Sequence, residues 1–187
     1  MKPFTFESPI ETERLTLRLL RPDDLDDVFA WMSDPDVARY QLYEPRSREQ
    51  VVEAIARSSV AVTLAEKGDF LQLAIVERSL GRVVGSIYFN LVDPENDTGE
   101  IGWALAAEFH GRGFATEAAL AVLELGFREV ALHRIYAELD PRNEASIRLC
   151  ERLGMRHEAH FVEHMMFKGA WADTGIYGLL EREWFAR

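Results

Sequence analysis

Residues 108–118 read "EFHGRGFATEA", in which two glycines flank Arg112 and a segment rich in alanine follows. The apolar residues after this loop recur at helical spacing, which predicts a helix that begins close to Gly113. A helix N-terminus offers unpaired backbone N–H groups and the positive end of the helix dipole, so the loop can bind an anion such as a diphosphate. The plain alternative is that the glycines serve only a tight turn.

Strands are predicted on both sides of this loop and its helix. Residues 99–106 alternate in polarity, and residues 133–139 form the next apolar segment. In the first strand, one face carries Ile101, Trp103 and Leu105, and the other carries Glu100, Gly102 and Ala104. A strand–loop–helix–strand unit of this kind normally gives a parallel pair with a right-handed crossover.

The flanking regions predict antiparallel strands and further helices. A hairpin is expected from residues 70–77 and 83–92 around Gly81, and a closing pair from residues 155–168 and 174–181 around the turn "GAWAD". The other predicted elements are a strand at 15–20, a helix after Pro22, a helix at 48–60 with a Ser47–Gln50 capping box, and a helix capped by Asn143 and ended by Gly154. The expected fold class is α/β (α+β), with a mixed central sheet of about seven strands.

Length and charge restrict the function classes. The 187 residues suggest one domain, and the net charge of −11 argues against nucleic-acid binding. An acidic surface attracts cationic partners such as amines, although acidity can also serve solubility alone. We find no apolar run of membrane-spanning length, so no membrane association is expected. The lone Cys150 excludes an internal disulfide and is compatible with a cytoplasmic location.

The glycine loop can be compared with two nucleotide-binding motifs. A P-loop is excluded because no Gly-Lys-Ser/Thr follows. Gly111, Gly113 and Thr116 match the dinucleotide fingerprint in two of three places, and Glu138 ends the next strand. That motif needs a third glycine and normally opens the chain, so a nucleotide-dependent oxidoreductase is only an alternative.

The loop resembles the signature of the GNAT superfamily of acyl-CoA-dependent N-acyltransferases, Gln/Arg-x-x-Gly-x-Gly/Ala. Here it reads His110-Gly111-Arg112-Gly113-Phe114-Ala115, with His110 as the departure. The chain also resembles the Rim-type ribosomal-protein N-terminal acetyltransferases, in "ETERLTLRLLRPDDLDDVFAWMSDP", "RNEASIRLCERLGM" and "FKGAWADTGIYGLLEREW". The resemblance implies one acetyltransferase domain over residues 1–187, with a core of about 10–184 and the GNAT fold.

The resemblance also implies which residues bind acetyl-CoA. The diphosphate would lie on the loop and first helical turn, the thioester oxygen would meet a backbone N–H of residues 103–105, and Asn143 would touch the pantetheine arm. The implied cofactor-binding residues are Trp103, Ala104, Leu105, His110, Gly111, Arg112, Gly113, Phe114, Ala115, Thr116, Asn143 and Ser146. We expect no metal, since "HEAH" at 157–160 is not a zinc motif.

Acetyl transfer to an amine needs a base, an oxyanion donor and an acid for the leaving thiolate. By resemblance, Glu100 is the first candidate base, because the histone-acetyltransferase branch of the superfamily places its glutamate on the strand before the glycine loop, and Glu163 is the competitor. Many family members use a tyrosine as the acid at the position of Cys150. Ser146 is therefore the candidate acid, against a purely local helical role. Cys150 also leaves open a covalent ping-pong route.

The acceptor side is the least determined. By resemblance, Trp31 and Tyr40 would wall an acceptor pocket between the first two helices and the last strands, although core packing is the commoner fate of such aromatics. The resemblance also suggests a homodimer. The amine could belong to a protein N-terminus or a small molecule, and a non-catalytic acyl-CoA-binding module is the remaining alternative.

Overall fold

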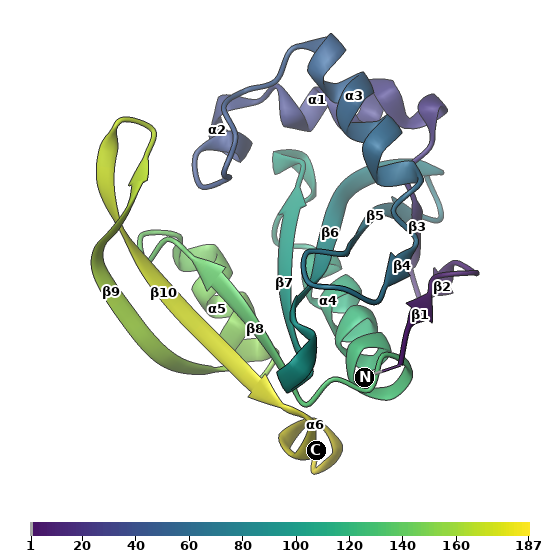
Figure 1. Ribbon diagram of the computed structural model, residues 1–187. Helices are drawn as coiled ribbons and strands as arrows, with labels where there is room; N and C mark the ends of the chain where they lie inside the picture. Colours follow the sequence, from purple (N-terminus) through teal and green to yellow (C-terminus); the bar gives the residue numbers. More distant parts are fainter. Residues whose placement is uncertain (1) are drawn as a thin grey trace.

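The strand–loop–helix–strand unit around the glycines lies at the centre of the molecule. The computed structural model describes residues 2–187, and in it β7 (Thr98–Leu105) is followed by α4 (Phe114–Glu124) and β8 (Arg134–Leu139) (Figure 1). A π-helical segment, Leu125–Glu129, extends α4. β7 and β8 are parallel neighbours, as the sequence predicted.

The central sheet is mixed and has eight strands in the order β2-β3-β5-β6-β7-β8-β10-β9. Only β7 and β8 pair in parallel, and the other neighbours are antiparallel. The remaining strands are β1 (Phe4–Thr5), β2 (Ile10–Glu11), β3 (Leu15–Leu19), β4 (Thr63–Leu64), β5 (Phe70–Glu77), β6 (Arg82–Asp93), β9 (Arg156–Phe167) and β10 (Ala170–Leu180). The sequence predicted about seven strands for this sheet, and the additional strand is the two-residue β2.

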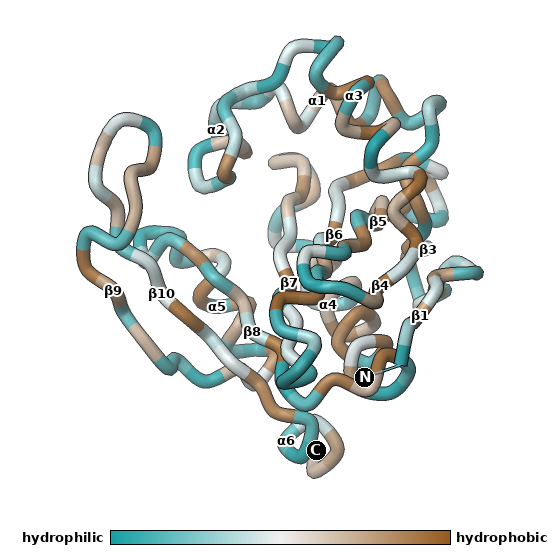
Figure 2. Tube along the Cα trace, viewed as in Figure 1, coloured by the Kyte–Doolittle hydropathy of each residue, from teal (hydrophilic) through white to brown (hydrophobic). Residues whose placement is uncertain are grey.

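Helices cover both faces of this sheet. The remaining helices are α1 (Leu25–Met32), α2 (Pro35–Ala38), α3 (Arg48–Ser59), α5 (Glu144–Arg152) and α6 (Glu181–Phe185). Figure 2 shows hydrophobic residues gathered along α4 and the strands beside it, with hydrophilic residues in the outer loops. Among the helices of residues 2–187, none has the length and apolar character needed to cross a membrane.

The alternation predicted for β7 separates two apolar cores. Ile101 and Leu105 belong to the larger core, which also contains α4 and the buried side of α5. Ala104 packs on the smaller core, which α1 and α3 close from the opposite face. The face of β7 that carries Glu100 and Ala104 therefore looks toward α1 and α3.

Local signals for helix ends and turns are mostly confirmed. Ser47 and Gln50 form the capping box of α3, Asn143 caps α5, and Gly154 ends α5 with φ of 75°. The predicted turn "GAWAD" is wrong, because the hairpin turns on Lys168 and Gly169 alone. Both residues have positive φ, 50° and 82°, as a two-residue hairpin turn requires, so residues 170–173 remain in β10.

Candidate active site

β7 and β8 are paired only near their beginnings. The register runs from Thr98 opposite Arg134 to Glu100 opposite Tyr136, whereas the strands continue to Leu105 and Leu139. Beyond Glu100 the strands therefore separate without hydrogen bonds between them. A cavity of about 300 Å³ lies at this gap and is lined by residues from both faces of the sheet.

Main-chain groups of β7 are open to the gap. The Gln41 side-chain amide donates to the Trp103 carbonyl oxygen (3.4 Å), and the His110 Nε2 lies 3.0 Å from the Leu105 carbonyl oxygen. The Ala106 N–H bonds instead to Val84 on β6. Because the N–H and C=O of one strand residue point to the same side, Trp103 and Leu105 turn their N–H groups toward the unpaired edge. These are candidate donors to an oxyanion.

Glu100 is the half-buried carboxylate at the point of separation. It lines the cavity, and burial together with the charge of Glu138 raises its pKa from 4.5 to about 7. Tyr136 lies beside it, and burial followed by the charges of Glu100 and Glu138 raises the pKa of its phenol to about 12. A carboxyl group with a pKa near 7 can accept a proton and release it again at neutral pH.

Ser146 lines the same cavity from α5. Its hydroxyl accepts a hydrogen bond from the Trp103 indole Nε1–H (3.2 Å), and its backbone N–H donates to the Asn143 Oδ1 (3.2 Å). The Asn143 cap thus fixes the start of α5 and places Ser146 next to β7. Asn143, Ser146 and Trp103 all line the cavity.

Cys150 lies one turn further along α5 and is fully buried. Burial raises the pKa of its thiol to about 12, so the thiol stays protonated at neutral pH. The nucleophilic form of cysteine is the thiolate, and a buried neutral thiol behaves as a small hydrophobic residue.

The glycine loop is shaped to admit a ligand at the start of α4. Gly111 and Gly113 have φ of 74° and 81°, which side chains rarely tolerate, and a Cβ on Gly111 would meet no atom within 4 Å. Within residues 2–187, the backbone N–H groups of residues 111–116 have no hydrogen-bond acceptor. This row of donors at a helix N-terminus fits a diphosphate.

Glu117 and Arg14 hold this loop in place. The Glu117 carboxylate accepts hydrogen bonds from the Thr12 hydroxyl (2.6 Å), the Arg14 backbone N–H (2.8 Å) and the Arg14 Nε (2.7 Å). Arg14 Nη1 also donates to the Arg112 carbonyl oxygen (2.9 Å). Sequence reasoning missed this contact because about one hundred residues separate its partners.

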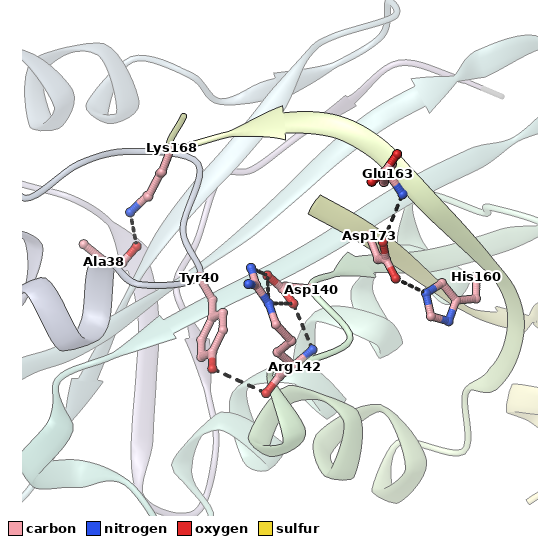
Figure 3. A network of polar contacts seen from close by, with 8 residues as sticks. All are labelled: Ala38, Tyr40, Asp140, Arg142, His160, Glu163, Lys168 and Asp173. Atoms are coloured by element: carbon pink, nitrogen blue, oxygen red, sulfur yellow. Dashed lines mark hydrogen bonds and ion pairs between the residues drawn. The ribbon is translucent and has the colours of Figure 1, made fainter. Parts of the chain in front are cut away.

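The predicted acceptor residues Trp31 and Tyr40 both line the cavity. Figure 3 shows how the chain around Tyr40 is attached. Its hydroxyl donates to the Arg142 carbonyl oxygen (3.4 Å), and Lys168 Nζ at the β9–β10 turn donates to the Ala38 carbonyl oxygen (2.7 Å). The expected helices α1 and α3 line the cavity together with residues 40–46, whereas among the described residues β9 and β10 contribute nothing to its lining.

Glu163, the second candidate base, lies on the β9–β10 hairpin and is exposed. It occupies an irregularity in the pairing of β9 with β10, with φ of 49°, and its N–H donates to Asp173 (2.9 Å). His160 Nε2 binds the same carboxylate (2.7 Å), as Figure 3 shows, while His164 contacts Thr174 instead. Glu163 does not line the cavity.

The structure adds residues that sequence reasoning did not assign to the site. They are Gln41, Arg46, Arg57, Tyr88, Glu138 and Asp140, all in the cavity lining. Glu138 could have been found, because two parallel neighbouring strands place their later residues at the same edge of the sheet. Gln41 and Arg46 depend on how residues 39–46 fold over the strands, which no local pattern records. Arg57, Tyr88 and Asp140 reach the lining from α3, β6 and the end of β8 through packing between distant segments.

Comparisons with known proteins place this architecture in one family. The family model "Acetyltransferase (GNAT) domain" matches residues 14–156. The uncharacterized N-acetyltransferase p20 of Bacillus licheniformis is 33% identical over 173 residues, covering 92% of this chain and 96% of that protein. An acetyltransferase of the GNAT family from Bacillus anthracis has a crystal structure with a TM-score of 0.85 and 31% identity, covering 94% of this chain and 100% of its own.

Two other similar proteins are named for their acceptors. The ribosomal protein uS5-alanine N-acetyltransferase of Escherichia coli is 29% identical over 84 residues, which is 45% of this chain and 43% of that protein. The spermidine N-acetyltransferase of Vibrio cholerae, solved in complex with CoA and spermine, has a TM-score of 0.77 at 21% identity. It covers 93% of this chain and 99% of its own, and at this identity the likeness concerns the fold alone.

Proposed function

This chain belongs to the GNAT family of acyl-CoA-dependent N-acetyltransferases, and from that premise we propose that it transfers the acetyl group of acetyl-CoA to a primary amine by direct attack. Both substrates would be bound together, acetyl-CoA from the side of α4 and α5 and the amine from the side of α1 and α3. The buried, neutral thiol of Cys150 favours this route over a covalent ping-pong mechanism.

The observation that carries the proposal is the pKa of Glu100 beside the open edge of β7. Amines are mostly protonated at neutral pH, so a base must remove a proton before attack. A carboxylate with a pKa of about 7 is suited to that task, and it lines the cavity where the strands separate. Glu163, exposed on the hairpin, has no such position and is the weaker candidate.

The remaining steps can be assigned to groups around the gap. The amine nitrogen forms a bond to the thioester carbon, and the carbon–sulfur bond breaks. The Trp103 and Leu105 N–H groups are oriented to stabilise the developing oxyanion, for which one donor is worth about 3 kcal/mol. Ser146 is the candidate donor of a proton to the leaving thiolate. Overall, an ammonium and acetyl-CoA give an amide, the CoA thiol and one released proton.

The acetyl-CoA site is proposed on residues 103–105, 110–116, Asn143 and Ser146. Its support is the row of N–H groups without acceptors at residues 111–116 and the open space around Gly111. When bound there, acetyl-CoA supplies the activated acetyl group, and this chain's residues orient it against the amine.

Two similar proteins are named for amines of different kinds, an alanine of ribosomal protein uS5 in one and spermidine in the other. A primary amine is what these acceptors share. We therefore extend to this chain only the class of primary amines, and fold and family alone do not choose among its members.

The test is an acetyl-CoA turnover screen over peptides, polyamines, aminoglycosides and amino acids, repeated with Glu100→Gln and with Glu163→Gln as the matched control. We expect Glu100→Gln to lower kcat by about 100-fold or more near pH 7 while acetyl-CoA still raises Tm. Unchanged turnover in Glu100→Gln would remove this residue from the mechanism. Binding of acetyl-CoA without turnover of any amine would favour the non-catalytic module.

A further inference from the structure

Two arginines line the same cavity as Glu100, and no carboxylate within residues 2–187 forms an ion pair with either of them. Arg46 lies between α2 and α3, and its guanidinium carbon is 4.7 Å from the centre of the Tyr43 ring. Arg57 comes from α3 and is exposed. Uncompensated arginines in a ligand cavity favour an anionic group on the ligand.

Two further polar groups in this part of the cavity lack partners. The Trp31 Nε1–H and the Tyr43 hydroxyl are buried and have no hydrogen-bond partner among the described residues. Trp31 is only 2% exposed. A buried donor without an acceptor is costly, so each such group points to a partner that the protein itself does not provide.

The cavity is therefore divided by charge. Its carboxylates, Glu100, Glu138 and Asp140, come from β7, β8 and the end of β8, and Asp140 is already paired with Arg142. Its arginines and unpartnered donors come from α1, α3 and the segment between α2 and α3. The glycine loop does not line this cavity, so the arginines are not part of the proposed diphosphate site.

We propose that the acceptor is a small amine that also carries a carboxylate. Its ammonium would lie toward Glu100 and Glu138. Its carboxylate would bind Arg46 and Arg57, with the Trp31 Nε1–H and the Tyr43 hydroxyl as additional donors. This inference rests on the proposed acetyl transfer and specifies its acceptor.

The size of the cavity agrees with a ligand of this class. A volume of about 300 Å³ corresponds to roughly ten water molecules at about 30 Å³ each. That space holds an amino acid or a short ω-amino acid next to the acetyl end of the cofactor. Comparing α-amino acids with ω-amino acids of increasing length then shows which distance between the amine and the carboxylate of the acceptor the cavity favours.

The experiment compares amines in matched pairs. Each α- or ω-amino acid is tested beside its carboxamide and beside the amine that lacks the carboxyl group. For wild type we expect kcat/KM to be at least about tenfold higher for the best carboxylate than for its partners. In Arg46→Gln and Arg57→Gln this ratio should fall toward one, through a higher KM for the carboxylate.

Arg48→Gln is the matched control, because Arg48 lies on α3 like Arg57 but pairs with Asp26 outside the cavity. It should keep the wild-type ratio. Circular dichroism and the Tm shift caused by acetyl-CoA establish that each variant is folded and binds the cofactor. Calorimetric titration of the CoA-bound protein with the best carboxylate gives a readout independent of turnover.

Several outcomes would overturn the inference while the proposed function stands. The first is equal or better turnover of the carboxamides or diamines, and the second is a preference for aminoalkylphosphonates over aminocarboxylates. The third is a ratio of kcat/KM, carboxylate to matched partner, that neither arginine variant changes. If no amine is acetylated although acetyl-CoA binds, the proposed function itself fails and this inference fails with it.

Discussion

Glu100 and Tyr136 face each other at the last paired position of β7 and β8, directly before the strands separate. Glu100 is therefore held by a continuous sheet on one side and opens onto the cavity on the other. This position accounts for its partial burial, and burial is the first cause of its pKa of about 7. The neighbouring charge of Glu138 is the second cause.

Replacing Glu138 should change the pH dependence of the reaction. Glu138→Gln removes a negative charge that disfavours ionisation of Glu100, so the acidic limb of the kcat–pH profile should move to lower pH. At pH 6 we expect a gain of about two- to threefold in kcat relative to wild type. Comparing both proteins with one amine cancels the titration of the acceptor. Glu144→Gln, on an exposed helix face, is the control. A kcat–pH profile that does not move in Glu138→Gln would show that the charge of Glu138 does not act on Glu100.

Glu100 should also make stability depend on pH. Its pKa is about 7 in the folded protein against an ordinary value of 4.5, so the folded state holds the proton more tightly. Stability contributed by this group is present below pH 4.5 and is lost as pH rises through 7. Glu100→Gln should therefore match wild type at low pH and exceed it at pH 8 by up to about 3 kcal/mol. Thermal unfolding from pH 5 to 8 measures this, and a difference that does not grow with pH would contradict the pKa.

Arg14 should govern affinity for acetyl-CoA rather than the chemical step. Arg14→Gln loses the ion pair with Glu117 and the hydrogen bond to the Arg112 carbonyl, which together position the glycine loop. Arg14 is partly exposed, so we expect a modest increase of about three- to tenfold in the KM for acetyl-CoA, with kcat nearly unchanged. Arg128→Gln, near the far end of α4, is the control. A fall in kcat alone would assign Arg14 a different role.

Cys150 should be dispensable for catalysis. Its thiol is buried and protonated, so Cys150→Ala should leave kcat within about twofold and lower stability by about 1 kcal/mol through the small cavity that it creates. Initial-rate patterns should intersect in both proteins. Parallel lines, or mass-spectrometric detection of acetylated Cys150, would restore the covalent route.

Ser146 should contribute to thiolate protonation. We expect Ser146→Ala to lower kcat by about 100-fold, the lower end of general acid catalysis, whereas a purely local helical role predicts less than about twofold. Trp103→Phe removes the indole N–H that binds the Ser146 hydroxyl and keeps most of the ring, so it tests whether this contact orients the hydroxyl. A substrate with a better thiol leaving group should restore much of the Ser146→Ala rate, and absence of rescue would argue against proton donation.

Features encoded by short segments could be predicted from sequence. The alternation of residues 99–106 gave the correct faces of β7, and the glycines and Asn143 gave the correct helix starts. These features depend on backbone preferences of one or two residues and on a period of two along a strand. They sufficed for the order of the central elements, whereas the site roles of Glu100, Trp103 and Ser146 were implied by the family resemblance.

Features set by distant segments could not be predicted. The charge of Glu138 acts on Glu100 because β7 and β8 pair in this register, which no local sequence pattern specifies. Glu163 was a candidate base, but it lies exposed in the irregular pairing of β9 with β10 and does not line the cavity. The position of Arg46 in the cavity lining depends on the fold of residues 39–46, whose sequence has no helical or strand period, whereas Arg57 comes from α3.

The open edge of β7 has a consequence for genetics. Its Trp103 and Leu105 N–H groups belong to the main chain, so every amino acid except proline supplies the same donor. Natural variation can therefore alter these side chains without removing the donors, and a survey of side-chain substitutions will not detect them. Their contribution needs chemical synthesis, with an ester in place of the amide at one position. The groups proposed to meet the thioester oxygen are then the ones that side-chain variation can alter least.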